Sequence, residues 1–139
     1  MERMSIALPD QRHARHAVVE MMKDKGIFLS PDRENEVMVV MGELFANCRE
    51  HGDCDYVEVD VARKDREYVV VKIEAPCYKD PERTKDWLER SDQIIDLFKV
   101  RGRGSEIVKA LSKVSVSPGS IDLAFKSPVV EQKLQLATA

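Results

Sequence analysis

The chain has 139 residues, of which 43% are hydrophobic and 34% charged, and its formal net charge at pH 7 is -3. This length fits a single domain, the hydrophobic share excludes a disordered chain, and the small net charge gives no general attraction to nucleic acid or anionic lipid. The longest apolar run, Val37 to Met41, is too short to span a bilayer, and the N-terminus has no signal-peptide core. We therefore expect a cytoplasmic protein that contacts neither nucleic acid nor membrane.

The first part of the chain predicts a strand followed by a helix. A short strand is expected over residues 4–8, after which Pro9-Asp10 turns the chain into a helix that runs to about Lys25. Gly26 suits the left-handed conformation that commonly follows the last turn of a helix.

A second helix is predicted from Ser30 to Glu50 or His51. Ser30 is expected to be its N-cap, the next residue is a proline suited to the first turn, and acidic residues follow near the positive end of the helix. Gly52 stops the helix.

Three polar residues are predicted to lie along one border of the apolar stripe of this second helix. The stripe consists of Val37, Val40, Met41, Leu44 and Cys48. Glu43, Asn47 and His51 follow one border of it in steps of four, so we expect them to be neither fully buried nor fully exposed. Two interpretations stay open: an ordinary polar border, or the lining of a cleft between helix and sheet.

Two strands are predicted next, at 56–61 and 68–73, because valines alternate with polar side chains in the first and apolar residues share one face of the second. Their short polar connection predicts an antiparallel hairpin in a sheet covered on one side. Residues 75–90 contain two prolines and dense mixed charge, which predicts a mobile loop with a short helix near its end.

The last part of the chain is predicted to contain two helices and a hairpin. The helices are expected at 91–100 and 105–113, and the strands at 114–116 and 121–125. Runs of adjacent strands predict an α+β fold: a two-layer α/β sandwich with a mostly antiparallel sheet and helices on one face.

Two further patterns suggest ligands. Cys48, His51 and Cys54 form C-x2-H-x2-C, but structural zinc usually takes four ligands, so free thiols are the competing interpretation. The sequence Arg-Gly-Arg-Gly at 101–104 leads into the helix expected at Ser105, where glycines allow close backbone approach and the helix N-terminus offers donors to phosphate.

Two segments carry a resemblance to a known family. Residues 43–52, Glu-Leu-Phe-Ala-Asn-Cys-Arg-Glu-His-Gly, resemble the asparagine box of the histidine-kinase-like ATPase superfamily, and residues 102–111 resemble its later glycine box. Within the superfamily, the likeness is strongest to the bacterial anti-sigma-factor serine/threonine kinases, and it covers about Met4 to Phe125. It implies a Bergerat-type ATP-binding domain over residues 1–126, with 127–139 as a flexible C-terminal tail.

The resemblance also implies roles for individual residues, with ATP and Mg²⁺ as cofactors. Asn47 would ligate Mg²⁺, Glu43 would orient or deprotonate the attacking hydroxyl, and Glu74 would accept the hydrogen bond of the adenine amino group. Residues 76–101 would form a lid. The phosphates would lie against Gly102, Arg103, Gly104 and Ser105.

The function implied is that of an anti-sigma-factor kinase, which binds a sigma factor and phosphorylates an antagonist protein; a homodimer is compatible with it. The first glycine box of the family is replaced here by Glu74-Ala75-Pro76-Cys77-Tyr78, which contains no glycine. The alternative is therefore a degenerate, non-catalytic member that binds a protein partner. A sensor-kinase fragment and an unrelated α+β domain are two further interpretations.

Overall fold

The computed structural model describes residues 4–7, 11–50, 55–78, 81–100 and 111–127. In this part of the chain there are three α-helices and five strands, with two 3₁₀ turns, η2 and η3, between β3 and α3. The elements are β1 Met4–Ala7, α1 Gln11–Asp24, α2 Pro31–Glu50, β2 Tyr56–Arg63, β3 Tyr68–Glu74, η2 Pro76–Tyr78, η3 Pro81–Arg83, α3 Thr84–Val100, β4 Leu111–Ser117 and β5 Ser120–Lys126.

The five strands form one open sheet in the order β1-β2-β3-β5-β4, and every neighbouring pair is antiparallel. The predicted hairpin is confirmed, since β2 pairs with β3 in a register that places Val61 opposite Val71. An α+β fold with a mostly antiparallel sheet is therefore the observed architecture.

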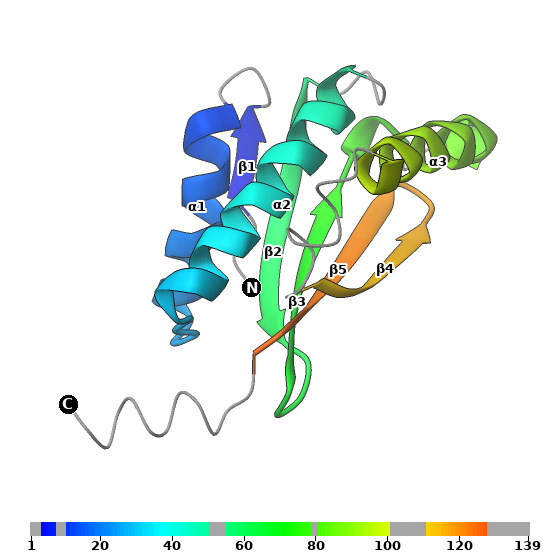
Figure 1. The fold of residues 1–139 in the computed structure, drawn as a ribbon. Coiled ribbons are helices and arrows are strands. Elements are labelled where there is room, and N and C mark those ends of the chain that lie inside the picture. Colours follow the sequence, from blue (N-terminus) through cyan, green and yellow to red (C-terminus); the bar gives the residue numbers. More distant parts are fainter. Residues whose placement is uncertain (1–3, 8–10, 51–54, 79–80, 101–110, 128–139) are drawn as a thin grey trace, which may run out of the picture.

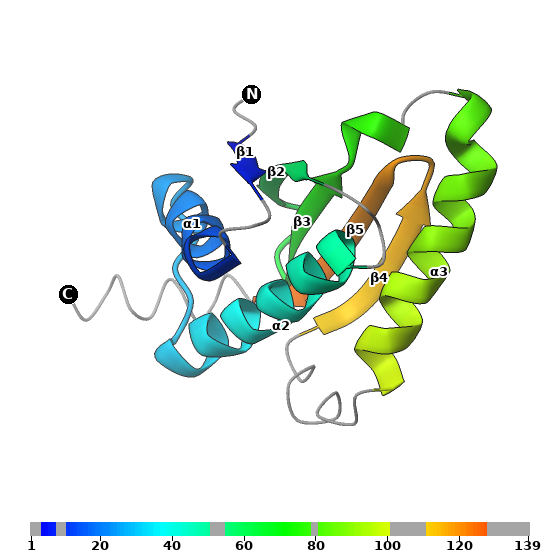
Figure 2. The same cartoon turned by 90° about the horizontal axis from the view of Figure 1, so that it is seen from above.

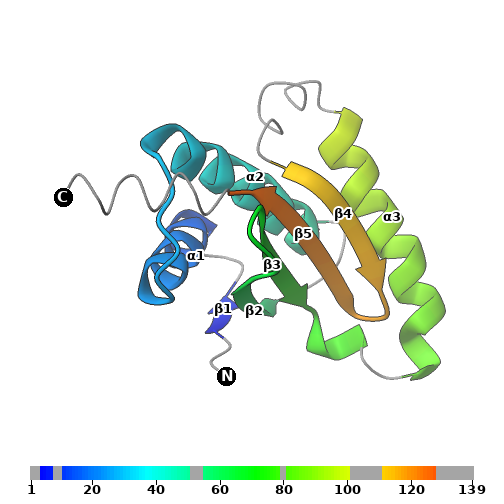
Figure 3. The same cartoon turned by 90° about the horizontal axis from the view of Figure 1, so that it is seen from below.

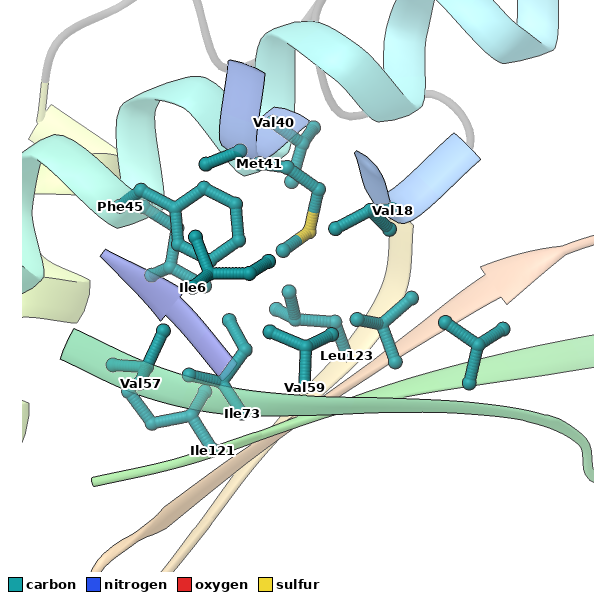
Figure 4. Packing of buried hydrophobic residues seen from close by; sticks show 14 of the residues in the cluster. Ile6, Val18, Val40, Met41, Phe45, Val57, Val59, Ile73, Ile121 and Leu123 are labelled. Atoms are coloured by element: carbon teal, nitrogen blue, oxygen red, sulfur yellow. The ribbon is translucent and has the colours of Figure 1, made fainter. Parts of the chain in front are cut away.

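Helices α1 and α2 lie over one face of the sheet, and α3 lies on the side of β4 (Figures 1 and 2). Seen from below, β3, β4 and β5 lie in front of α2 (Figure 3). The strand residues that point to the helices are buried: Val57, Val59, Val61, Val69, Val71, Ile73, Ile121, Leu123 and Phe125. Figure 4 shows part of this core, where Met41 and Phe45 of α2 lie above the strands. Burial of each such side chain contributes about 1.5–3 kcal/mol.

The helix ends follow the sequence signals. Gly26 adopts a left-handed φ of 75°, and the amides of Gly26 and Ile27 donate to the carbonyls of Lys23 and Met22 at 3.0 and 2.8 Å. This is the Schellman pattern of helix termination. At the start of α2, Ser30 Oγ accepts a hydrogen bond from the amide of Arg33 at 3.3 Å, which confirms the predicted N-cap.

The helix predicted at 91–100 and the short helix expected near the end of 75–90 are both present, but as one continuous helix, α3, which begins at Thr84 and runs to Val100, so the predicted loop is too long. Charged residues of this segment lie on the outer side of α3. Asp86 forms ion pairs with Arg90 at 3.8 Å and with Arg83, the residue before the helix, at 3.3 Å. Trp87 and Ser91 are buried on the inner side. Spacings of three and four residues along a helix bring such partners together.

The helix predicted at 105–113 is wrong at its C-terminal end, and residues 105–110 lie outside the described part of the chain. Residues 111–113 belong to β4, where Leu111 pairs with Phe125 and Val114 with Leu123. A register irregularity between Leu111 and Lys113 brings two residues that are three apart onto one face of the sheet.

Ser127, the last residue that the structure describes, lies one residue beyond the predicted domain boundary at 126 and is held by hydrogen bonds. Ser127 is 3% exposed, its amide donates to Glu67 O at 2.7 Å, and Arg63 Nη1 donates to its carbonyl at 2.8 Å. The rest of the predicted tail, 128–139, lies outside the described residues. In the described helices, no segment is long and apolar enough to cross a membrane.

Candidate functional site

The candidate site begins with Glu43 and Asn47, one turn apart on α2. Glu43 is half-buried, as predicted, but Asn47 has 0% of its surface exposed, so the predicted border position is wrong for Asn47. Its Oδ1 atom accepts no hydrogen bond within the described structure, although Asn47 takes part in another interaction. His51, the third member of the row, lies outside the described residues.

Helices α1 and α3 lie on different sides of α2 (Figure 2). On one flank α1 approaches at Gly42, where an added Cβ would lie 3.5 Å from Arg15 Cδ. Because successive residues turn by about 100° around a helix, Glu43 and Asn47 lie on the flank that faces away from α1. Helix α3 contacts α2 and lies on that other side (Figure 2).

Glu74, the predicted adenine acceptor, lies at the end of β3. It pairs in register with Glu58 of β2 and Ser120 of β5, and side chains along a strand alternate between faces. Because Ile73 points to the helices, Glu74 points to the opposite face, where it is 7% exposed. The structure therefore does not bring Glu74 and Asn47 together on one face.

The residue after Glu74 takes the next position toward the helices, and it is an alanine. Ala75 is 1% exposed and its amide donates to Gly119 O at 2.8 Å. A methyl group cannot hydrogen-bond a base. The inward position at the end of β3 thus carries no polar side chain.

An aromatic cluster follows directly after Ala75. Tyr78 and Trp87 are each 1% exposed, and their ring centroids are 5.1 Å apart at an interplanar angle of 44°. The guanidinium of Arg83 lies 4.7 Å from the centroid of the Tyr78 ring. The indole N–H of Trp87 donates to the carbonyl of Ser117 at 2.6 Å. Tyr78 and Trp87 thus form a buried part of the predicted lid segment, and the hydrogen bond of Trp87 joins this segment to β4.

The remaining predicted ligands lie outside the described part of the chain. These are Gly102, Arg103, Gly104 and Ser105, and the second and third residues of the cysteine–histidine motif, His51 and Cys54. Cys48 is buried in the core. The described residues contain no group of three His, Cys, Asp or Glu side chains that could hold a metal ion.

Asn47, the predicted ligand of Mg²⁺, is fully covered in this structure. Mg²⁺ usually keeps several of its waters and takes only one or two protein ligands. Asn47 has no exposed surface on which such a hydrated ion could lie, and Glu74 faces the other side of the sheet. The sequence singles out Trp87 as an anchor of this segment or as a simple packing residue, and it is packed; its partner Tyr78 is not predicted, although both are aromatic residues within a densely charged segment.

A comparison of the sequence with models of known protein families gave no match, and a comparison with curated proteins gave none either. The family resemblance therefore rests on the motifs quoted above.

Proposed function

We propose that this chain is a regulatory protein-binding domain with the Bergerat-type fold of the anti-sigma-factor kinases and a closed nucleotide site. Two features of the fold support the relationship. An antiparallel sheet lies beneath α2, the helix that carries Glu43 and Asn47, and α3 follows β3 on the flank where the family has its lid.

The burial of Asn47 carries the proposal. In the proposed fold, this asparagine must reach a bound ion, yet here it has no exposed surface. Ala75, the buried residue that follows β3, offers no polar side chain, and Tyr78 and Trp87 pack against each other in the segment that follows. Such a domain acts by binding a partner rather than by turning over ATP.

The partner class follows from the same relationship. We propose a sigma factor or an antagonist protein of an anti-sigma factor, bound directly and without nucleic acid, with a homodimer as the form that binds. No ATP or Mg²⁺ is required for this binding.

A second candidate is the ATP-dependent serine/threonine kinase itself. One observation favours it: an amide side chain occupies a fully buried position among apolar residues of α2. Burial of a polar side chain costs free energy that burial of an apolar side chain would not, and ligation of Mg²⁺ by the proposed kinase would be a reason for an amide at this position. The kinase would need a second conformation in which Asn47 is accessible.

Partner binding separates the two candidates. The purified chain would be mixed with sigma factors and antagonist proteins of its own source and followed by light scattering after gel filtration, with and without ATP and Mg²⁺. Complex formation without nucleotide, equal in wild type and Asn47→Ala, supports the binding domain. A complex that requires MgATP, or phosphate transfer to the antagonist that Asn47→Ala abolishes, supports the kinase. Failure to bind any of these proteins would overturn both.

A further inference from the structure

The sheet has one face on which none of the described helices lies. Helices α1 and α2 lie over the other face, and in Figure 3 β3, β5 and β4 lie in front of α2 with no described helix in front of them. Side chains alternate between the two faces along a strand. We call this side the open face. On β2, β3 and β5 its half-buried and exposed residues are Asp60, Ala62, Tyr68, Val70, Lys72, Asp122, Ala124 and Lys126.

The strand register sorts these residues into three rows that cross the strands. The middle row is apolar and consists of Ala62, Val70 and Ala124. The row on one side of it consists of Asp60, Lys72 and Asp122, and the row on the other side consists of Tyr68 and Lys126. An apolar centre therefore lies between a row of net negative charge and a row that carries a lysine.

Two opposite charges of the open face have no ion-pair partner in the described part of the chain. Asp60 is paired with Lys25 at 2.7 Å. Asp122 accepts a hydrogen bond from Ser120 Oγ at 3.5 Å, but among the described residues neither Asp122 nor Lys126 forms an ion pair. They are four residues apart on β5, a separation of about 13 Å along a strand, so they cannot pair with each other.

We propose that the open face binds the open face of a second copy of this chain, about a twofold axis that crosses the strands along the middle row. Rotation about this axis lays each strand over its own copy with its direction reversed. Asp122 and Lys126 lie two residues before and after Ala124, so Asp122 of each copy lies over Lys126 of the other. The apolar rows meet at the centre, as an isologous interface between two packed sheets requires.

This interface goes beyond the proposed function, because the open face and Asn47 lie on opposite sides of the sheet. It gives a defined surface to the homodimer, and the tests of the two are separate. Loss of self-association would overturn the interface, whereas the binding of sigma factors or antagonist proteins by the chain tests the proposed function.

Sedimentation equilibrium of the intact chain at low ionic strength, from about 10 µM to about 1 mM, tests the interface. The wild type should dimerise reversibly. Lys126→Glu places a glutamate over Asp122 of the other copy, so it should weaken the dimer by at least about tenfold. Lys85→Glu is the matched control with the same net charge, since Lys85 is exposed on α3; it should leave the dissociation constant within about twofold of wild type.

An exchange of the two charges makes the test specific. Asp122→Lys alone should weaken the dimer as Lys126→Glu does, and it serves as the second single variant if one of them does not fold by circular dichroism. The double variant Asp122→Lys/Lys126→Glu should restore the dimer to within about threefold of wild type. Because the two residues cannot pair within one chain, such a rescue must come from the second copy.

Three results would overturn the interface. The first is a wild type that stays monomeric over the whole concentration range. The second is a folded Lys126→Glu variant that dimerises as the wild type does, which would place the dimer contact elsewhere. The third is a folded double variant that dimerises no better than the single variants.

Discussion

Arg15 of α1 lies across Gly42 of α2: a Cβ added to Gly42 would stand 3.5 Å from Arg15 Cδ, an ordinary van der Waals distance. The nearest side chain therefore leaves room for a methyl group. A side chain at position 42 would therefore meet no clash that requires a glycine there. The conformational freedom of Gly42 in the unfolded chain destabilises the helix relative to alanine.

Gly42→Ala should stabilise the protein. A glycine in a helix interior costs about 1 kcal/mol relative to alanine, and the new methyl group gains contact with Arg15. Urea denaturation should show a free energy of unfolding higher by about 0.5–1 kcal/mol. Gly26→Ala is the control with opposite sign: nothing lies within 4 Å of its added Cβ, but its φ is 75°, so the variant should lose about 1–2 kcal/mol. Equal shifts in the two variants would refute this reasoning.

Lys25 should stabilise the junction between α1 and β2. Its Nζ forms an ion pair with Asp60 at 2.7 Å and also donates to the carbonyl of Val61. Both charged side chains are partly buried, so Lys25→Met should lower the free energy of unfolding by about 1–2 kcal/mol in urea.

Lys23→Met is the control for this ion pair. The Nζ atom of Lys23 lies 3.6 Å from Oε1 of Glu20 and 3.7 Å from Oε1 of Glu34, which are longer distances, and its side chain is 42% exposed. Its replacement should change stability by less than about 0.5 kcal/mol. Similar losses of unfolding free energy in Lys25→Met and Lys23→Met would contradict a specific contribution of the Lys25 contacts to stability.

Ser30 should contribute as an N-cap. Its Oγ accepts from the Arg33 amide, so Ser30→Ala should lower the free energy of unfolding by about 1 kcal/mol. Ser115→Ala, at an exposed position of β4, should stay within about 0.5 kcal/mol of wild type. An unchanged midpoint for Ser30→Ala in thermal or urea unfolding would exclude the capping role.

The parts of the fold that local patterns determine were predictable. The β2–β3 hairpin, the Gly26 termination and the Ser30 cap all depend on residues close in sequence. The start of α3 is hard to predict because charged residues surround Trp87 and Ser91, the two buried residues among those of α3 whose burial is described, 84–92. The last helix is predicted too far along the chain: residues 111–113 belong to β4, in which Leu111 pairs with Phe125, whereas Val114 is in a strand as predicted.

The candidate site was harder to predict because it depends on tertiary contacts. The apolar stripe of α2 predicts Asn47 at a border, whereas Asn47 is completely buried, and burial of a border residue depends on how other elements pack on the helix, which the stripe does not determine. The orientation of Glu74 was present in the sequence: Val69, Val71 and Ile73 alternate toward the core, so the next residue must face away.

Calorimetric titration with ATP, with and without Mg²⁺, tests the central claim of a closed nucleotide site most directly. The wild-type chain and Asn47→Ala would be titrated side by side, after circular dichroism shows that both are folded. A closed nucleotide site predicts no binding heat at millimolar ATP for either protein, with or without Mg²⁺. Magnesium-dependent binding by the wild type that Asn47→Ala loses would contradict it and would establish a working nucleotide site at α2.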